Sequence, residues 1–175
     1  MSEAVAAVIE QGRRARAGGR LQEALAEYLR ASTIAEASGL TLERVAALEG
    51  VGQIERDLGR HEAASANYRE AVEVCRGANA PVRMAHALRH LADIECERGL
   101  YEAAMGPVSE ALEIYRQHPG VSPLELANTL RVLALLQESR GDSAVAAWRE
   151  ARELYVSAGV EIGVKECEAR LRDVG

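Results

Sequence analysis

Apolar residues recur three and four positions apart along the chain, and no stretch alternates between apolar and polar residues with a period of two. This spacing places apolar side chains on one face of an α-helix and argues against half-buried strands. Glycine, proline and short polar clusters interrupt the pattern at regular intervals, where turns are expected. We therefore predict helices at 3–17, 21–37, 42–58, 61–76, 81–98, 101–117, 123–140, 143–157 and 161–173.

The pattern repeats when the sequence is shifted by 40 residues. The columns that align are Ala24, Ala64, Ala104 and Ala144; Tyr28, Tyr68, Val108 and Trp148; Ala31, Ala71, Ala111 and Ala151; and Ile34, Val74, Ile114 and Leu154. The loop HPGVSP is two residues longer than its predecessor, so Gly141 arrives two residues late and the register recovers by Trp148. Each unit reads as two helices. Such a pair cannot bury its apolar faces alone, so the pairs are expected to stack.

Small residues recur inside the first helix of each unit, at Gly12, Gly52, Ala92 and Ala134. Glycine inside a helix costs about 1 kcal/mol relative to alanine. We therefore predict a close approach of the two backbones at these points, with the aromatic column filling the wider part of each pair. The segment SPLE at 122–125 is predicted to form a capping box, with proline at the first helical position.

This order of residues resembles the tetratricopeptide repeat, in which a glycine, a turn glycine, an alanine, an aromatic residue and a second alanine follow at fixed spacing. The second unit carries the pattern at Gly52, Gly59, Ala64, Tyr68 and Ala71, and the first unit repeats it unchanged. The third unit keeps it with two substitutions and the fourth with altered spacing. The period of 40 is longer than the common 34. It looks like that of the kinesin-light-chain type of tetratricopeptide repeat.

The resemblance implies an all-α fold, a right-handed superhelix (α-solenoid) of about four helix pairs with a C-terminal capping helix. We expect a single domain over residues 1–175. The expected repeats lie at about 2–39, 40–79, 80–120 and 121–158, and the capping helix at about 160–174.

Composition narrows the class of partner. The formal net charge is −6, whereas proteins that bind nucleic acid usually present a basic face. The one basic cluster, RRAR at 13–16, is interpreted as the solvated side of a helix. Cys75, Cys96 and Cys167 form no C-x-x-C motif and are expected to be reduced thiols, as in a cytoplasmic protein. The arginine-rich, alanine-rich composition suggests a bacterial source, and neither a signal peptide nor a membrane-spanning run is apparent.

Candidate chemistry is sparse. No glycine-rich phosphate loop, G-x-S-x-G or H-E-x-x-H motif occurs, so we predict a non-enzymatic protein with no catalytic residue and no cofactor. The nearest candidate is HALRHLADIECE, where His86 and His90 lie one turn apart and Asp93 and Glu97 continue the same face. A metal or enzyme site there is the less favoured alternative, and a polar helix face the favoured one.

In the resembled family, ligands lie on the concave side, which the first helices line. Transferring those positions gives a candidate groove of Arg13, Arg16, Glu49, Gln53, Arg56, His86, Arg89, His90, Asp93, Glu97, Asn128, Arg131, Leu135 and Glu138. The lysine and asparagine clamp of the chaperone-tail-binding members is replaced here by Glu49, Gln53, Arg89 and Asp93. This replacement argues against a chaperone-tail role.

The function that follows is a protein-interaction scaffold holding a peptide segment or a partner helix in this groove, centred on the third unit. Arg56, Arg89 and Arg131 are the candidates to grip carboxylates of the partner. Alternatively, Asp93, Glu97 and Glu138 neutralise those arginines. Binding is expected to tighten as pH falls, through His86 and His90. A second hypothesis is a peptide-sensing regulatory module that acts through a separate partner. Any homodimer is expected to form through the terminal helices.

Overall fold

The computed structural model describes residues 2–173, which form nine α-helices and no strand. The helices are α1 (Ser2–Ala17), α2 (Leu21–Ala37), α3 (Thr41–Asp57), α4 (His61–Gly77), α5 (Pro81–Glu97), α6 (Tyr101–Gln117), α7 (Pro123–Ser139), α8 (Val145–Ser157) and α9 (Glu161–Asp173). Each packs mainly on the helix before it and the helix after it. The chain is therefore an all-α, right-handed solenoid, as predicted.

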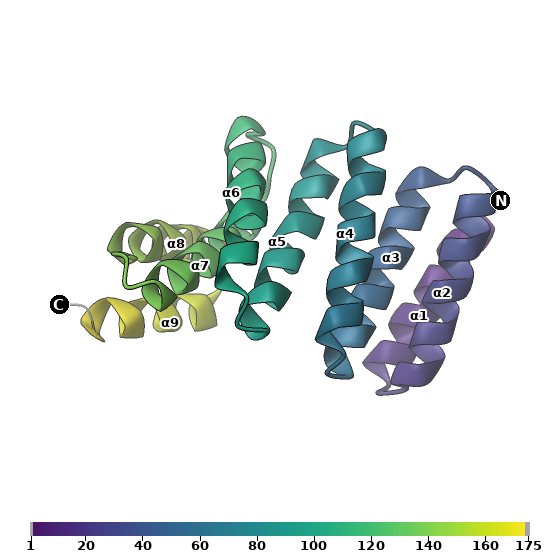
Figure 1. Ribbon diagram of the computed structural model, residues 1–175, viewed down its shortest axis with the longest axis horizontal. Helices are drawn as coiled ribbons and strands as arrows, with labels where there is room; N and C mark the ends of the chain where they lie inside the picture. Colours follow the sequence, from purple (N-terminus) through teal and green to yellow (C-terminus); the bar gives the residue numbers. More distant parts are fainter. Residues whose placement is uncertain (1, 174–175) are drawn as a thin grey trace.

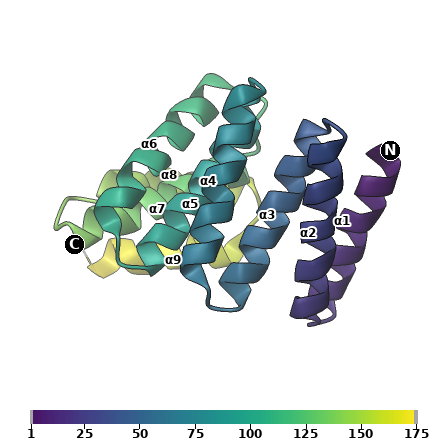
Figure 2. The ribbon, with the colours of Figure 1, turned by 45° about the vertical axis from the view of Figure 1, so that its right-hand side comes forward.

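The helices form two layers, with α2, α4 and α6 in front of α1, α3 and α5 in the view of Figure 1. Within the first-helix layer, α1 contacts α3 and α5 contacts α7. The ends of the chain lie at opposite ends of the array (Figure 1), and α7–α9 are turned relative to the first six helices in both views (Figures 1 and 2). This turn follows the inserted loop between α6 and α7.

The predicted helix boundaries hold to within two residues. The largest error is at α8, which begins at Val145 where the sequence pattern suggested residue 143. The two residues gained in the α6–α7 loop are thus removed from the start of α8, so that Trp148 regains its register. Residue 174, the last of the predicted capping helix, lies outside the described residues.

The capping box at 122–125 forms only in part. The Ser122 hydroxyl accepts a hydrogen bond from the backbone N–H of Leu124 at 3.2 Å. The Glu125 carboxylate, which a full capping box would direct back to the Ser122 backbone, instead lies near Tyr115 and Arg89. Tertiary contacts have replaced the local hydrogen bond.

Most helices end in the same way. A residue with positive φ follows the helix, and the next N–H reaches a carbonyl five residues back, as Arg20 N does to Ala15 O at 2.9 Å. This is the Schellman arrangement, which glycine adopts without strain. The residues with positive φ are Gly19, Gly39, Gly59, Asn79, Gly99, Gly141 and Gly159. Their spacing, close to 20 residues, makes both the turn within a pair and the turn between pairs nearly uniform. The α6–α7 loop breaks this spacing.

The aligned columns form the core, but the small residues serve a purpose other than the predicted one. The side chains of Ala24, Ala64, Ala104 and Trp148 are fully buried, and that of Tyr68 is nearly so. A Cβ on Gly52 would lie 2.7 Å from the Tyr68 ring, and one on Gly12 would lie 3.0 Å from the Tyr28 ring. The prediction that these glycines allow backbone–backbone contact is therefore wrong, because the aromatic ring itself occupies the space.

The aromatic ring of a second helix also contacts the first helix of the following unit. The Tyr28 ring lies against Gly50 and the Tyr68 ring stacks on His90, with centroids 5.1 Å apart. At the C-terminal end the guanidinium of Arg170 lies 5.8 Å from the centre of the Trp148 ring. Each ring thus lies between two first helices. The stacking on Tyr68 fixes the position of the His90 ring in the third unit.

Candidate functional site

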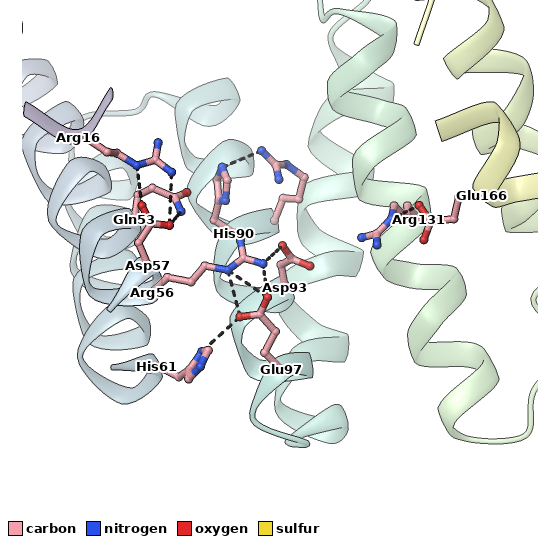
Figure 3. A network of polar contacts seen from close by, with 11 residues as sticks. Arg16, Gln53, Arg56, Asp57, His61, His90, Asp93, Glu97, Arg131 and Glu166 are labelled. Carbon is pink, nitrogen blue, oxygen red and sulfur yellow. Dashed lines mark hydrogen bonds and ion pairs between the residues drawn. The ribbon is translucent and has the colours of Figure 1, made fainter. Parts of the chain in front are cut away.

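The face formed by α1, α3, α5 and α7, here called the first-helix face, carries the predicted groove residues. Ion pairs connect side chains along this face (Figure 3). Arg16 binds Asp57 at 2.7 Å, and Gln53 donates to the same carboxylate at 2.9 Å. Burial would raise the pKa of Asp57, but the hydrogen bonds from Arg16 and Gln53 hold it below its usual value. The carboxylate is therefore ionised and fully engaged.

Arg56 is the most heavily paired residue of this face. It binds Asp93 at 2.7 Å and also Glu97, which His61 approaches at 3.3 Å. Burial alone would lower the pKa of Arg56, but the hydrogen bond to Glu97 and the charges of both carboxylates raise it above its ordinary value. For this arginine the neutralised alternative holds, since two carboxylates of the chain already occupy the guanidinium.

Glu49 joins α3 to the start of α5. Its two carboxylate oxygens accept from Arg83 at 2.7 Å and contact His86 Nδ1 at 3.1 Å. The rings of His86 and His90 meet edge to face, 4.6 Å apart. Ring packing and Glu49 thus fix the two histidines.

Arg89 is only 8% exposed, and its neighbours do not fill all of its hydrogen-bond donors. One terminal nitrogen lies 2.8 Å from His90 Nε2, while its Nε has no hydrogen bond and lies 3.5 Å from Glu125. Burial, together with the positive charges of Arg89 and His86, lowers the pKa of His90 to about 2. His90 is neutral at any physiological pH, so the predicted tightening of binding at low pH cannot come from it.

A hollow of about 330 Å³, here called the central hollow, lies across α5, α7 and α9. Four of the predicted residues line it, namely Arg89, Asp93, Asn128 and Arg131, with Tyr155 and Glu166 beside them. Arg131 binds Glu166 at 2.7 Å (Figure 3), and this hydrogen bond raises the pKa of Arg131 against the lowering effect of burial. The Asn128 Oδ1 accepts from the Tyr155 hydroxyl at 2.8 Å.

Ten of the fourteen predicted residues lie outside this hollow, among them Glu138, Leu135 and Arg13. Glu138 accepts from Trp148 Nε1 at 2.7 Å and pairs with Arg170, so it does not neutralise the three arginines as supposed. Leu135 packs on the C-terminal core. Arg13 lies on α1, paired loosely with Glu10 at 3.8 Å, beside a separate depression that Arg16 and Tyr28 also line.

Sequence reasoning missed the partners of these arginines: Asp57, Glu125 and Glu166. One signal was present. Arg16 and Asp57 are separated by 41 residues, and so are Arg56 and Glu97. The period of 40 residues aligns Arg16 with Arg56 and Asp57 with Glu97. Either ion pair would therefore have predicted the other. No such signal predicted Glu166. It lies on α9, the last helix that the structure describes, so no later unit repeats its contact.

The other candidate chemistry finds little support. Among residues 2–173 no group of three or more His, Cys, Asp or Glu side chains is arranged to hold a metal ion. Burial raises the pKa values of Cys75, Cys96 and Cys167 to about 11, so these thiols are poor nucleophiles. Within the same residues, no helix combines the length and the apolar character that crossing a membrane requires.

Residues 7–77, which include most of α1 and all of α2–α4, match the tetratricopeptide repeat family model. Residues 7–77 carry tetratricopeptide repeats. The resemblance to kinesin-light-chain repeats is also supported by a solved structure from Podosopora anserina, a putative kinesin light chain with nearly identical tetratricopeptide-like repeats. That structure is 16% identical, with a TM-score of 0.59 over 98% of this chain and 94% of its own.

Two further solved structures have higher TM-scores. BtubC (BKLC) from P. vanneervenii is 21% identical with a TM-score of 0.79, over 89% of this chain and 64% of its own. Aspartyl phosphate phosphatase F from Bacillus subtilis is 14% identical with a TM-score of 0.85, over 95% of this chain and 44% of its own. This chain thus spans less than two thirds of either structure, and at these identities the likeness concerns the fold. No curated protein matches the sequence.

Proposed function

We propose that this protein is a non-enzymatic interaction scaffold that holds an extended segment of a partner protein across the first-helix face. The proposal rests chiefly on the central hollow, where four of the predicted groove residues meet. The tetratricopeptide repeats support the general role, since this family is generally non-catalytic and mediates protein–protein contacts. The centre of binding is at α5 and α7, with α9 completing the wall.

The residues of the hollow suggest how a segment would be held. Asn128 uses its carbonyl oxygen for Tyr155, so its two N–H donors remain for a backbone carbonyl of the ligand. Arg131 and Glu166 are each about one third exposed. A pair of this kind is worth about 0–1 kcal/mol. A carboxylate of the partner can therefore replace Glu166 on Arg131 at little cost, with a bidentate contact.

Arg56 is unsuited to that exchange. Its side chain is only 22% exposed, and two carboxylates would have to be displaced. We therefore assign recognition to Arg131 and a structural role to Arg56. Arg89 contributes a fixed positive charge beneath the segment.

The test is a selection of displayed random peptides against the folded protein, followed by mapping of an enriched peptide on the amide resonances of the labelled protein. We expect acidic peptides whose binding shifts α5, α7 and α9. Arg131→Glu should weaken binding by about tenfold, the effect of losing one charge-assisted contact of about 1.4 kcal/mol or more.

A pair of charge swaps controls for folding. The double variant Arg131→Glu with Glu166→Arg restores the local ion pair but reverses its sense, and should still bind weakly. The matched swap Arg116→Glu with Glu150→Arg lies on the second helices α6 and α8, where the natural pair is 2.8 Å long, and should bind normally. If both swaps bound the peptide as the parent does, the first-helix face would not be the binding surface.

A further inference from the structure

The inserted loop between α6 and α7 lines a second pocket. Its volume is about 550 Å³, within the range of about 300–1,000 Å³ that ligand pockets occupy. The walls come from the first turns of α5, the end of α6, the loop residues 118–122 and Glu125 of α7. The loop is held in place, because Val121 N donates to His118 O at 3.0 Å. We call this the loop pocket.

One wall of the loop pocket is apolar, and the rest of its lining is polar: Arg83, His86, Gln117, His118, Ser122 and Glu125. Val82, Pro119, Val121 and the ring of Tyr115 supply the apolar surface. Val82 is 39% exposed although it stands beside this surface. An apolar side chain left facing an apolar hollow gains stability when an occupant removes it from water.

One acceptor in the loop pocket follows from the geometry of His118. Its Nδ1 lies 2.7 Å from the carbonyl oxygen of Ile114. A carbonyl only accepts, so Nδ1 carries the hydrogen and Nε2 of the neutral ring is left as an acceptor. Glu125 adds carboxylate oxygens at the same pocket, 3.4 Å from the Tyr115 hydroxyl. The site therefore combines an apolar wall with two acceptors: Nε2 of His118, and the Glu125 carboxylate, which already accepts from Tyr115.

We infer that the loop pocket receives an aromatic side chain bearing a hydrogen-bond donor, tryptophan or tyrosine, from the partner segment. Such side chains join a large apolar body to one N–H or O–H group. The pocket adjoins the central hollow through Glu125, which lines the loop pocket and lies 3.5 Å from Arg89 of the hollow. A segment lying across α5 and α7 can thus place one residue in each. This inference rests on the proposed function and adds the residue that the segment must carry.

The experiment uses blocked single amino acids as probes, followed on the amide resonances of the whole labelled protein. N-acetyl-tryptophanamide should shift Val82, Tyr115 and Val121 saturably. The 1-methyl derivative, which lacks the indole donor, and N-acetyl-leucinamide should bind about threefold to tenfold more weakly, the loss of one net hydrogen bond. Equal binding of all three probes, or shifts elsewhere on the protein, would overturn the inference.

A matched pair of variants identifies the pocket. Val82→Asp places a charge in the apolar wall, and should weaken the tryptophan probe by about tenfold or more. The acid sits in the first turn of α5, where it suits the helix dipole, so the fold should be kept. Leu42→Asp changes the equivalent position of α3, which has no inserted loop beside it, and should leave the probe unaffected. If Val82→Asp also left the probe unaffected, the inference would fail.

The two proposals fail separately. If selected peptides depend on Arg131 but not on Val82 and carry no required aromatic residue, the scaffold proposal stands and the loop-pocket inference falls. If no peptide engages the first-helix face, the proposed function falls, whatever the blocked amino acids do.

Discussion

Gly52 lies beneath the ring of Tyr68, where an added Cβ would come within 2.7 Å of a ring carbon. The ring is 2% exposed and has no space to move into. We expect Gly52→Ala to lower the free energy of unfolding by about 1–3 kcal/mol through overpacking. This is opposite to the usual gain of about 1 kcal/mol for glycine to alanine in a helix.

Gly77 provides the matched control, because it is the last residue of α4 and a Cβ there would meet nothing within 4 Å. Gly77→Ala should raise the free energy of unfolding by about 0.5–1 kcal/mol. Urea denaturation of the two variants measures both effects. Changes of the same sign would show that the ring does not press on Gly52.

His90 makes the stability of the protein depend on pH. Burial, with the nearby charges of Arg89, His86, Arg56 and Arg16, lowers its pKa from 6.5 to about 2. Below pH 6.5 the unfolded chain binds a proton that the folded chain refuses, so stability is complete above that pH and falls progressively towards pH 2. We expect a loss of about 1 kcal/mol between pH 7.5 and 5.5 from this group.

The comparison is between the parent and His90→Gln, each unfolded with urea at both pH values. Other titrating groups are common to the two proteins and cancel in the difference. If the variant loses as much stability on acidification as the parent does, His90 is not the responsible group.

At the scale of single residues the sequence predicts which positions are buried better than what they touch. The columns at Ala64 and Trp148 are in the core as predicted. The neighbours of Gly52 and of Arg131 were not predicted, because they depend on how far one helix leans on the next. The periodicity of the sequence predicts on which face of its helix a residue lies. The residues that it contacts depend on the angle between neighbouring helix pairs.

The helices themselves were predictable because each turn is encoded locally. A glycine at the position of positive φ ends a helix regardless of its surroundings. The start of α8 was misplaced because three residues, 142–144, separate it from Gly141, whereas one residue separates Gly59 from α4 and Gly99 from α6. The boundary is set instead by the register of Trp148, a tertiary constraint.

Trp148 is the side chain that fixes α8 in the array. It is fully buried, donates to Glu138 at 2.7 Å and faces the guanidinium of Arg170. Trp148→Ala should reduce the free energy of unfolding by about 3–5 kcal/mol. Trp148→Phe keeps most of the packing but loses the N–H donor, and should cost about 1–3 kcal/mol because Glu138 loses a partner. Thermal and urea unfolding would separate the two, and equal losses would place the whole effect in the hydrogen bond.

At the scale of the molecule, ion pairs link successive units on both layers. Arg16 with Asp57 and Arg56 with Glu97 do so on the first-helix face. Arg76 with Glu110, and Arg116 with Glu150, do so on the second helices, each separated by 34 residues. The more exposed pairs, Arg76 with Glu110 and Arg116 with Glu150, contribute about 0–1 kcal/mol each. Their regular placement therefore bears more on the register between units than on total stability.

The array should unfold locally, because each helix depends mainly on its immediate neighbours. The α9 helix packs on α8, and its Gly163 meets the ring of Tyr155. A chain shortened to end at Gly159 would expose that ring and remove Arg170 from Trp148. We expect faster hydrogen exchange, by about tenfold or more, in the amides of α7 and α8, with no change in α1–α4.

The inserted loop gives this prediction a sharp boundary. The α7–α9 helices are turned relative to α1–α6, and the largest break in the regular spacing of the turns within residues 2–173 lies between α6 and α7. Protection lost on removing α9 should therefore stop near that loop. Removal of α1 is the mirror control and should expose α2 and α3 only. If either shortened chain lost protection evenly along its length, the solenoid would be one cooperative unit, and a ligand in the central hollow would stabilise α1 as strongly as α9.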